Sequence, residues 1–210
     1  MKNVSLLGVN HISKESTERI ISAVERLQPD IICVELDTQR SQSLDSRTFP
    51  RLSFLRKVGI FGYIFAVIGY VIQGFLGRKT GVMPGDEMKT AIRIANEKNI
   101  TVALIDRPIE RTLYRLRKVP WKERFRVLSD ALLRKTPSIS FDPSSIPNPE
   151  TLQPLLTFFS SRYPYLANVL LHERDAFMAQ KIREVLVSND TVLVIIGAAH
   201  LPGVQEQLNT

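Results

Sequence analysis

Two histidines occupy the same position of a repeated four-residue pattern. Gly-x-x-His occurs at Gly8 to His11 and again at Gly197 to His200, and each copy follows a short apolar run. The chain has only three histidines, so two of them share this context. Imidazoles bind metal ions, transfer protons near neutral pH or make buried hydrogen bonds. Either histidine alone is best read as structural, whereas the pair indicates a functional site.

Charged residues also follow the other apolar runs. Glu35 lies at the end of the second run, and Arg107 lies two residues past the third. Two neutral imidazoles and a carboxylate can hold a divalent ion and leave one position open for water, whose pKa the ion lowers. A second carboxylate would accept the proton, and Arg40 or Arg107 would stabilise an oxyanion or bind a substrate carboxylate. Mixed nitrogen and oxygen ligation suits manganese, cobalt, iron or zinc.

The elements that must position these residues follow from the order of the runs. Four β-type runs, at 4–9, 30–36, 101–105 and 191–196, are separated by helical segments. Parallel strands need such crossovers, so we predict an α/β fold with a mostly parallel central sheet flanked by helices. Sheets of this kind place their sites beyond the carboxyl ends of the strands. The paired histidines, Glu35 and Arg107 all fall there.

We expect a single domain over residues 1–210. A helical insertion, about 38–83, follows the second strand, and a helical region precedes the last strand. A segment with five prolines, about 136–154, is typical of a loop or linker.

Inside the insertion, residues 58–76 carry no charge and approach the length of a membrane-spanning helix. A single crossing would separate strands that must share one sheet. We expect this segment to be a buried helix, a homodimer surface or a helix lying on a membrane, and the last two are favoured.

Composition limits the class of protein further. Hydrophobic residues make up 44% and charged residues 23% of the 210 residues, which is a globular balance. The net charge of +7 permits attraction to nucleic acid or anionic lipid, but no nucleic-acid-binding motif accompanies the basic clusters, so we expect no nucleic acid partner. The single cysteine, Cys33, indicates a reducing compartment, so we expect the chain in the cytoplasm or at the cytoplasmic face of a membrane.

Several segments resemble the TraB family, which includes the PrgY and GumN proteins and the animal TIKI proteases. The matching segments cover most of the chain in order. They are LLGVNHISKES (6–16), DIICVELDTQR (30–40), PGDEMKTAI (84–92), VALIDRPIERTLYR (102–115), ERDAFMAQKI (173–182) and IIGAAHLPGV (195–204).

The resemblance implies a metal-dependent hydrolase that acts on a peptide or a related amide or ester. Its ion would be held by His11, Glu35 and His200, with manganese or cobalt favoured and zinc or iron as alternatives. Family members are linked to the shutdown of a peptide pheromone, which implies a peptide-like substrate or ligand. The remaining charged site residues would be Arg40, Glu87, Arg107, Glu173, Arg174 and Asp175.

Alternatives are open for both residues and function. Glu35 and Arg40 could pair with each other or with Arg107, and Glu87 could only favour a helix N-terminus. The triplet at 173–175 could be an exposed helix face. As a protein, the chain could be a non-catalytic regulator that sequesters a peptide or pheromone, or a membrane-associated scaffold with a vestigial site.

Overall fold

A parallel sheet forms the centre of the molecule. The computed structural model describes residues 3–10, 14–42, 44, 55–56, 58–60, 62–64, 66–67, 70, 85–133 and 149–210. Within these ranges the strands are β1 (Asn3–Val9), β2 (Ile31–Val34), β3 (Thr101–Leu104) and β4 (Thr191–Gly197). Their order is β1-β4-β2-β3, and every pairing is parallel. The predicted α/β class is confirmed.

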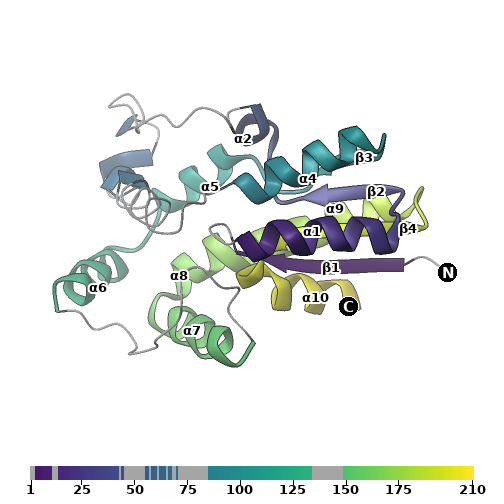
Figure 1. Cartoon of the computed structure of the whole chain (residues 1–210). Coiled ribbons are helices and arrows are strands. Elements are labelled where there is room, and N and C mark those ends of the chain that lie inside the picture. Colours follow the sequence, from purple (N-terminus) through teal and green to yellow (C-terminus); the bar gives the residue numbers. More distant parts are fainter. Residues whose placement is uncertain are drawn as a thin grey trace.

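The sheet order places the two Gly-x-x-His motifs on neighbouring strands. In the register of β1 and β4, Gly8 lies opposite Ile196 and Val9 lies opposite Gly197. On the other side of β4, the N–H of Glu35 extends the pairing with β2 by donating to the carbonyl oxygen of Ile195 at 3.1 Å. The ends of all these strands therefore point to one edge of the sheet (Figure 1).

Helices cover both faces of the sheet (Figure 1). On one face, α1 (Lys14–Leu27) and α4 (Asp86–Glu97) pack Ile20 and Met88 against side chains such as Ile195. On the other face, α9 (Glu173–Leu186) and α10 (Leu201–Asn209) pack Met178 and Val204 against Val194. Because β4 is covered on both sides, it is a continuous apolar run rather than an alternating one.

Burial on both faces also decides the role of the single cysteine. Cys33 lies on β2 in the second core and is fully buried. Burial raises the pKa of its thiol to about 12, so the thiolate is not formed near neutral pH. Cys33 is a core residue.

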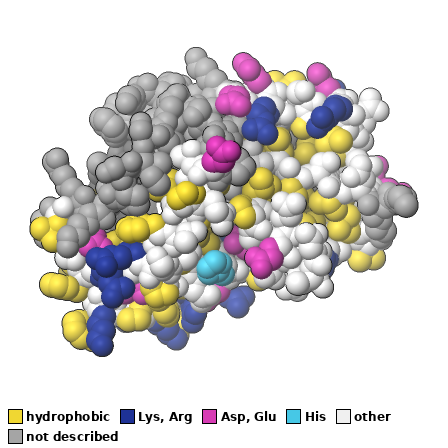
Figure 2. Space-filling model, turned by 90° about the horizontal axis from the view of Figure 1, so that it is seen from below, with side chains coloured by type: hydrophobic (Ala, Val, Ile, Leu, Met, Phe, Trp, Pro, Cys, Tyr) yellow, Lys and Arg dark blue, Asp and Glu magenta, His cyan; other side chains and the backbone are white. Residues whose placement is uncertain are grey.

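The helical region before β4 gathers beyond the carboxyl ends of the strands (Figure 1). It comprises α5 (Ile109–Leu116), α6 (Trp121–Leu132), α7 (Pro149–Arg162), α8 (Pro164–Ala167) and a π-helical turn, Asn168–His172, that runs directly into α9. Leu116, Val119, Leu166 and Val169 form a separate small core. A group of Lys and Arg side chains lies at the left-hand end of the face in Figure 2, the end at which Figure 1 places α6.

One local expectation differs from the structure. The expected proline-rich loop over 136–154 ends earlier, because α7 already begins at Pro149, where a residue without an N–H lies in the first turn at no cost. Pro154 lies inside the same helix.

The insertion after β2 begins with the short helix α2 (Thr38–Gln42). Most of the charge-free segment 58–76 lies outside the described residues, and residues 58–60, 62–64, 66–67 and 70 within it are helical. Across the part of the chain that the structure describes, no helix is both long and apolar enough to cross a membrane.

Candidate active site

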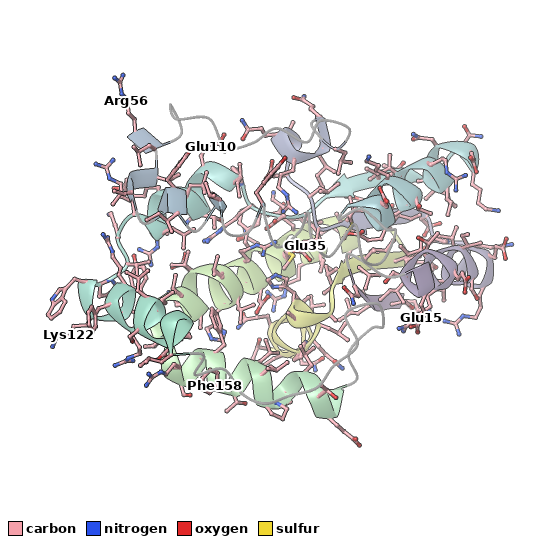
Figure 3. The ribbon with its side chains drawn as sticks, turned by 60° about the vertical axis from the view of Figure 1, so that its left-hand side comes forward. Glu15, Glu35, Arg56, Glu110, Lys122 and Phe158 are labelled. Atoms are coloured by element: carbon pink, nitrogen blue, oxygen red, sulfur yellow. The ribbon has the colours of Figure 1, made fainter. Side chains whose placement is uncertain are left out.

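The carboxyl ends of three strands deliver buried polar side chains to one place. Glu35 follows β2, Asp106 follows β3, and His200 ends the short 3-10 turn Ala198–His200 after β4. All three side chains are buried. Figure 3 shows Glu35 at the centre of the molecule, whereas Glu15 of α1 and Lys122 of α6 lie at its periphery.

The guanidinium of Arg174, in the first turn of α9, joins these groups. Nε donates to Oδ1 of Asp106 at 3.1 Å, and Nη2 donates to Oδ2 of Asp106 at 2.7 Å and to Oε1 of Glu35. Nη1 donates to the carbonyl oxygen of Leu170 at 3.4 Å and contacts Nε2 of His200 at 2.8 Å. A guanidinium has five N–H donors, so each of them has an acceptor here.

Arg174 therefore carries a fixed positive charge inside the protein. Burial disfavours that charge, but Glu35 and Asp106 outweigh the burial and hold the pKa of Arg174 above its ordinary value.

The contact with Arg174 determines the tautomer of His200. A guanidinium can donate but cannot accept, so Nε2 of His200 must be the unprotonated nitrogen. Nδ1 then carries the proton and donates to Oδ1 of the buried Asp175 at 2.6 Å. Nε2 lies 3.5 Å from Oε1 of Glu35. The result is a neutral imidazole held by a carboxylate, with its Nε2 lone pair directed at the guanidinium of Arg174 at the centre of the site.

The glycine of the second motif also takes part. The N–H of Gly197 donates to Oε2 of Glu35 at 2.6 Å. One oxygen of Glu35 is thereby bound to β4, and the other faces Arg174. The motif thus contributes both its backbone and, three residues later, its imidazole.

A second ion-pair cluster lies next to the first. The buried Arg107 donates to Oε2 of Glu173 at 2.6 Å, to the carbonyl oxygen of Val169 at 2.6 Å and to the hydroxyl of Thr112 at 2.9 Å. Arg115 donates to the other oxygen of Glu173 at 2.5 Å. Burial favours the neutral acid, but these two arginines outweigh it and hold the pKa of Glu173 below its ordinary value. Val169 belongs to the π-helical turn, an element that occurs often at functional sites.

The structure brings most of the predicted site residues together. Arg40 donates to Asp106 at 2.9 Å and is held by Asp37, whose Oδ1 accepts from the backbone N–H groups of Gln39 and Arg40. Glu87 is buried and accepts from the N–H of Gly85 at 3.1 Å, at the start of its own helix. His11 lies outside the described residues.

Two expectations about the charged residues change. The triplet at 173–175 is not an exposed face, since its side chains are 25%, 15% and 5% exposed. Glu173 and Arg174 make ion pairs, and Asp175 accepts a hydrogen bond from His200. Asp106 was not among the candidate site residues, although it binds both Arg40 and Arg174. The sequence did contain one indication of this role, because Asp106 directly follows the third apolar run and precedes Arg107.

The donor atoms present fit a metal ion only in part. His200 Nε2 and Glu35 Oε1 converge, but both contact Arg174, a cation that already occupies the position between them. Among the residues that the structure describes, no three His, Cys, Asp or Glu side chains form a group that could hold an ion. In this arrangement, a metal ion bound by His200 and Glu35 would exclude the guanidinium of Arg174, and the guanidinium would exclude the ion.

The fold and the site together define a class of protein. It is a parallel α/β domain with a buried histidine, carboxylates and arginines at its strand ends. The chain belongs to the TraB/PrgY/gumN family, whose family model matches residues 2–210. It is 32% identical to the uncharacterized protein MJ1365 of Methanocaldococcus jannaschii over 98% of this chain and 53% of that protein. It is 22% identical to a human TraB domain-containing protein over 99% of this chain and 63% of that protein. The chain therefore spans about half to two thirds of the length of these relatives.

Replacing Asp106 by Asn should destabilise the fold strongly. The change leaves Arg174 and Arg40 short of one compensating charge, and breaking a buried ion pair costs about 3–5 kcal/mol. Urea denaturation measures the loss. Glu97→Gln is the control, because the Arg93–Glu97 pair is 59% and 57% exposed and its loss should cost about 0.5 kcal/mol or less. Equal effects of the two variants would contradict a buried charge centre.

Replacing Gly203 by Ala should disturb the His200–Asp175 pair. A Cβ at position 203 of α10 would lie 2.1 Å from Oδ2 of Asp175, so that carboxylate must move. We expect a loss of about 1–3 kcal/mol in unfolding free energy and a shift of the imidazole N–H resonance of His200 in NMR spectra. Gln205→Ala, which alters an exposed residue of the same helix, should leave the unfolding free energy and the His200 resonance unchanged. An unshifted resonance in the Gly203 variant would mean that α10 does not position Asp175.

Proposed function

We propose that this chain hydrolyses a peptide, or a related amide or ester, and that His200 is the base that activates water. The observation that supports this proposal is the state of the imidazole: Nδ1–H is fixed by Asp175, and the lone pair of Nε2 faces the centre of the site. A histidine oriented by a carboxylate is a recurrent general base in acyl transfer.

Arg174 would take part in the reaction by changing partners. When a substrate enters, Nη1 would give up its contact with His200 and donate to the substrate carbonyl oxygen, while Nε and Nη2 stay on Asp106. Nε2 of His200 is then free to take a proton from water as the water oxygen attacks the carbonyl carbon. The negative charge that develops on the carbonyl oxygen meets the guanidinium. The proton passes from His200 to the leaving nitrogen or oxygen, and the bond to the carbonyl carbon breaks.

The divalent ion that the sequence predicts belongs to this proposal as a competitor of Arg174. His200 and Glu35 would hold it together with His11, and the bound ion would supply water of lowered pKa. Because the guanidinium contacts both described donor atoms, the ion requires Arg174 to leave them.

A hydrolase of this kind should lose activity when the base is removed. In His200→Ala and Asp175→Asn, we expect peptide cleavage to fall about 100-fold or more, since general bases contribute factors of this size. Cleavage of a mixed peptide pool, read by mass spectrometry with and without added manganese or cobalt, measures it. His172→Ala is the matched control, because His172 is exposed on the π-helical turn and its loss should change nothing.

Removing Arg174 should strengthen metal binding if the guanidinium and an ion compete. In Arg174→Gln we expect manganese, cobalt or zinc to bind about tenfold tighter than in the wild type, because a charge-assisted contact no longer has to be broken. Calorimetric titration measures the affinity, and Arg174→Lys, which keeps the charge, should behave like the wild type. Unchanged or weaker binding in Arg174→Gln would contradict the competition.

A second candidate is a regulator that binds a peptide without cleaving it. It is favoured by the full set of acceptors around Arg174, which describes a stable ion-pair centre as well as a reactive one. Peptides that bind to the wild type and to His200→Ala alike, with no cleavage in either, would support this candidate over the hydrolase.

A further inference from the structure

A groove between α5 and α9 lies beside the candidate active site. Its volume is about 520 Å³. The α5 side contributes Arg111 and Arg115, one turn apart, and the α9 side contributes Glu173, Ala176, Phe177 and Gln180. These α9 positions repeat at intervals of three and four residues, so they form one face of the helix.

The groove has more positive than negative charge. Glu173 is shared by Arg107 and Arg115 and is the only carboxylate in the described lining. Arg111 is exposed, and the structure gives its guanidinium no partner among the described residues. Arg115 binds Glu173 through Nη2 only, and its buried Nε has no hydrogen-bond partner. A buried arginine N–H without a partner beside a cavity indicates that an acceptor is missing, and Arg111 places a second guanidinium at the same opening.

The groove and the active site share the same two chain segments. Asp106 contacts Arg174 in the active site, while the next residue, Arg107, lines the groove. Likewise Glu173 lines the groove and Arg174 lies in the active site. Consecutive residues therefore face the two compartments, and a ligand in the groove lies next to the reactive centre.

We propose that the groove binds the free α-carboxylate of a peptide, so that the site acts close to a peptide C-terminus. Arg111 and Arg115 would bind the carboxylate, since guanidinium groups pair with carboxylates through two parallel hydrogen bonds. Phe177 and Ala176 provide an apolar surface for the last side chain of the peptide. The amide oxygen of Gln180, whose Nε2 donates to Glu184, can accept from the peptide backbone. The inference rests on the proposed function and names its substrate class.

The test compares an acetylated tripeptide ending in phenylalanine as a free acid and as a C-terminal amide. Calorimetry with the His200→Ala variant measures binding without turnover. We expect the acid to bind at least tenfold tighter than the amide, and Arg111→Ala to abolish that difference. Arg115→Lys should reduce it. Arg26→Ala, an exposed arginine on α1, is the matched control and should leave it unchanged.

The outcomes separate this inference from the proposed function. Equal binding of acid and amide, or binding of inorganic phosphate as tight as that of the acid, would overturn the carboxylate site, even if the wild type cleaves peptides. A preference for the acid that depends on Arg111 supports the site, even if the wild type cleaves neither compound, and in that case the hydrolase proposal fails alone.

Discussion

A permanent cation below the surface is the constraint on which the rest of the site depends. An isolated buried charge costs far more free energy than a fold of this size has to spare, so Arg174 is tolerated only because all five of its N–H groups find acceptors. Those acceptors come from the ends of β2, β3 and β4 and from the π-helical turn. Segments that are far apart in the sequence must therefore meet at one point. The parallel sheet brings the strand ends together, and the π-helical turn runs directly into the first turn of α9, where Arg174 lies.

The same constraint fixes the chemistry of His200. Because Arg174 can only donate, the imidazole must keep its Nε2 lone pair and place its proton on Nδ1, where Asp175 accepts it. Asp175 is held in turn by the close approach of α10 at Gly203. The protonation state of His200 thus depends on Arg174, which contacts Nε2, and on the packing of α10 against Asp175, which contacts Nδ1.

Much of this arrangement could be predicted from the sequence. The remainder depends on which way individual side chains and helix faces are turned, which a sequence does not show. The four β-type runs and their polar ends predict the sheet and the edge that carries the site, because strand periodicity and crossovers are local signals. Which of two adjacent residues faces the site is not local. Asp106, rather than Arg107, meets Arg174, and the triplet at 173–175 turns inward in the first turn of α9, directly after the π-helical turn. Pro149 resembled a loop residue because proline is disfavoured in helix interiors, although the first turn of a helix accepts it.

The two ion-pair clusters are joined through the backbone, and this has a consequence for substrate binding. Glu173 is bound by Arg107 and Arg115, and it immediately precedes Arg174 on α9. A carboxylate that enters the groove competes with Glu173 for Arg115, which leaves Glu173 held by Arg107 and by the side-chain amide of Asn168. Any resulting movement at the start of α9 acts on the guanidinium that contacts His200 and Glu35. Since Nε and Nη2 remain tied to Asp106, the contact most easily released is the single one from Nη1 to His200. Occupation of the groove and release of the base would then be one coupled event.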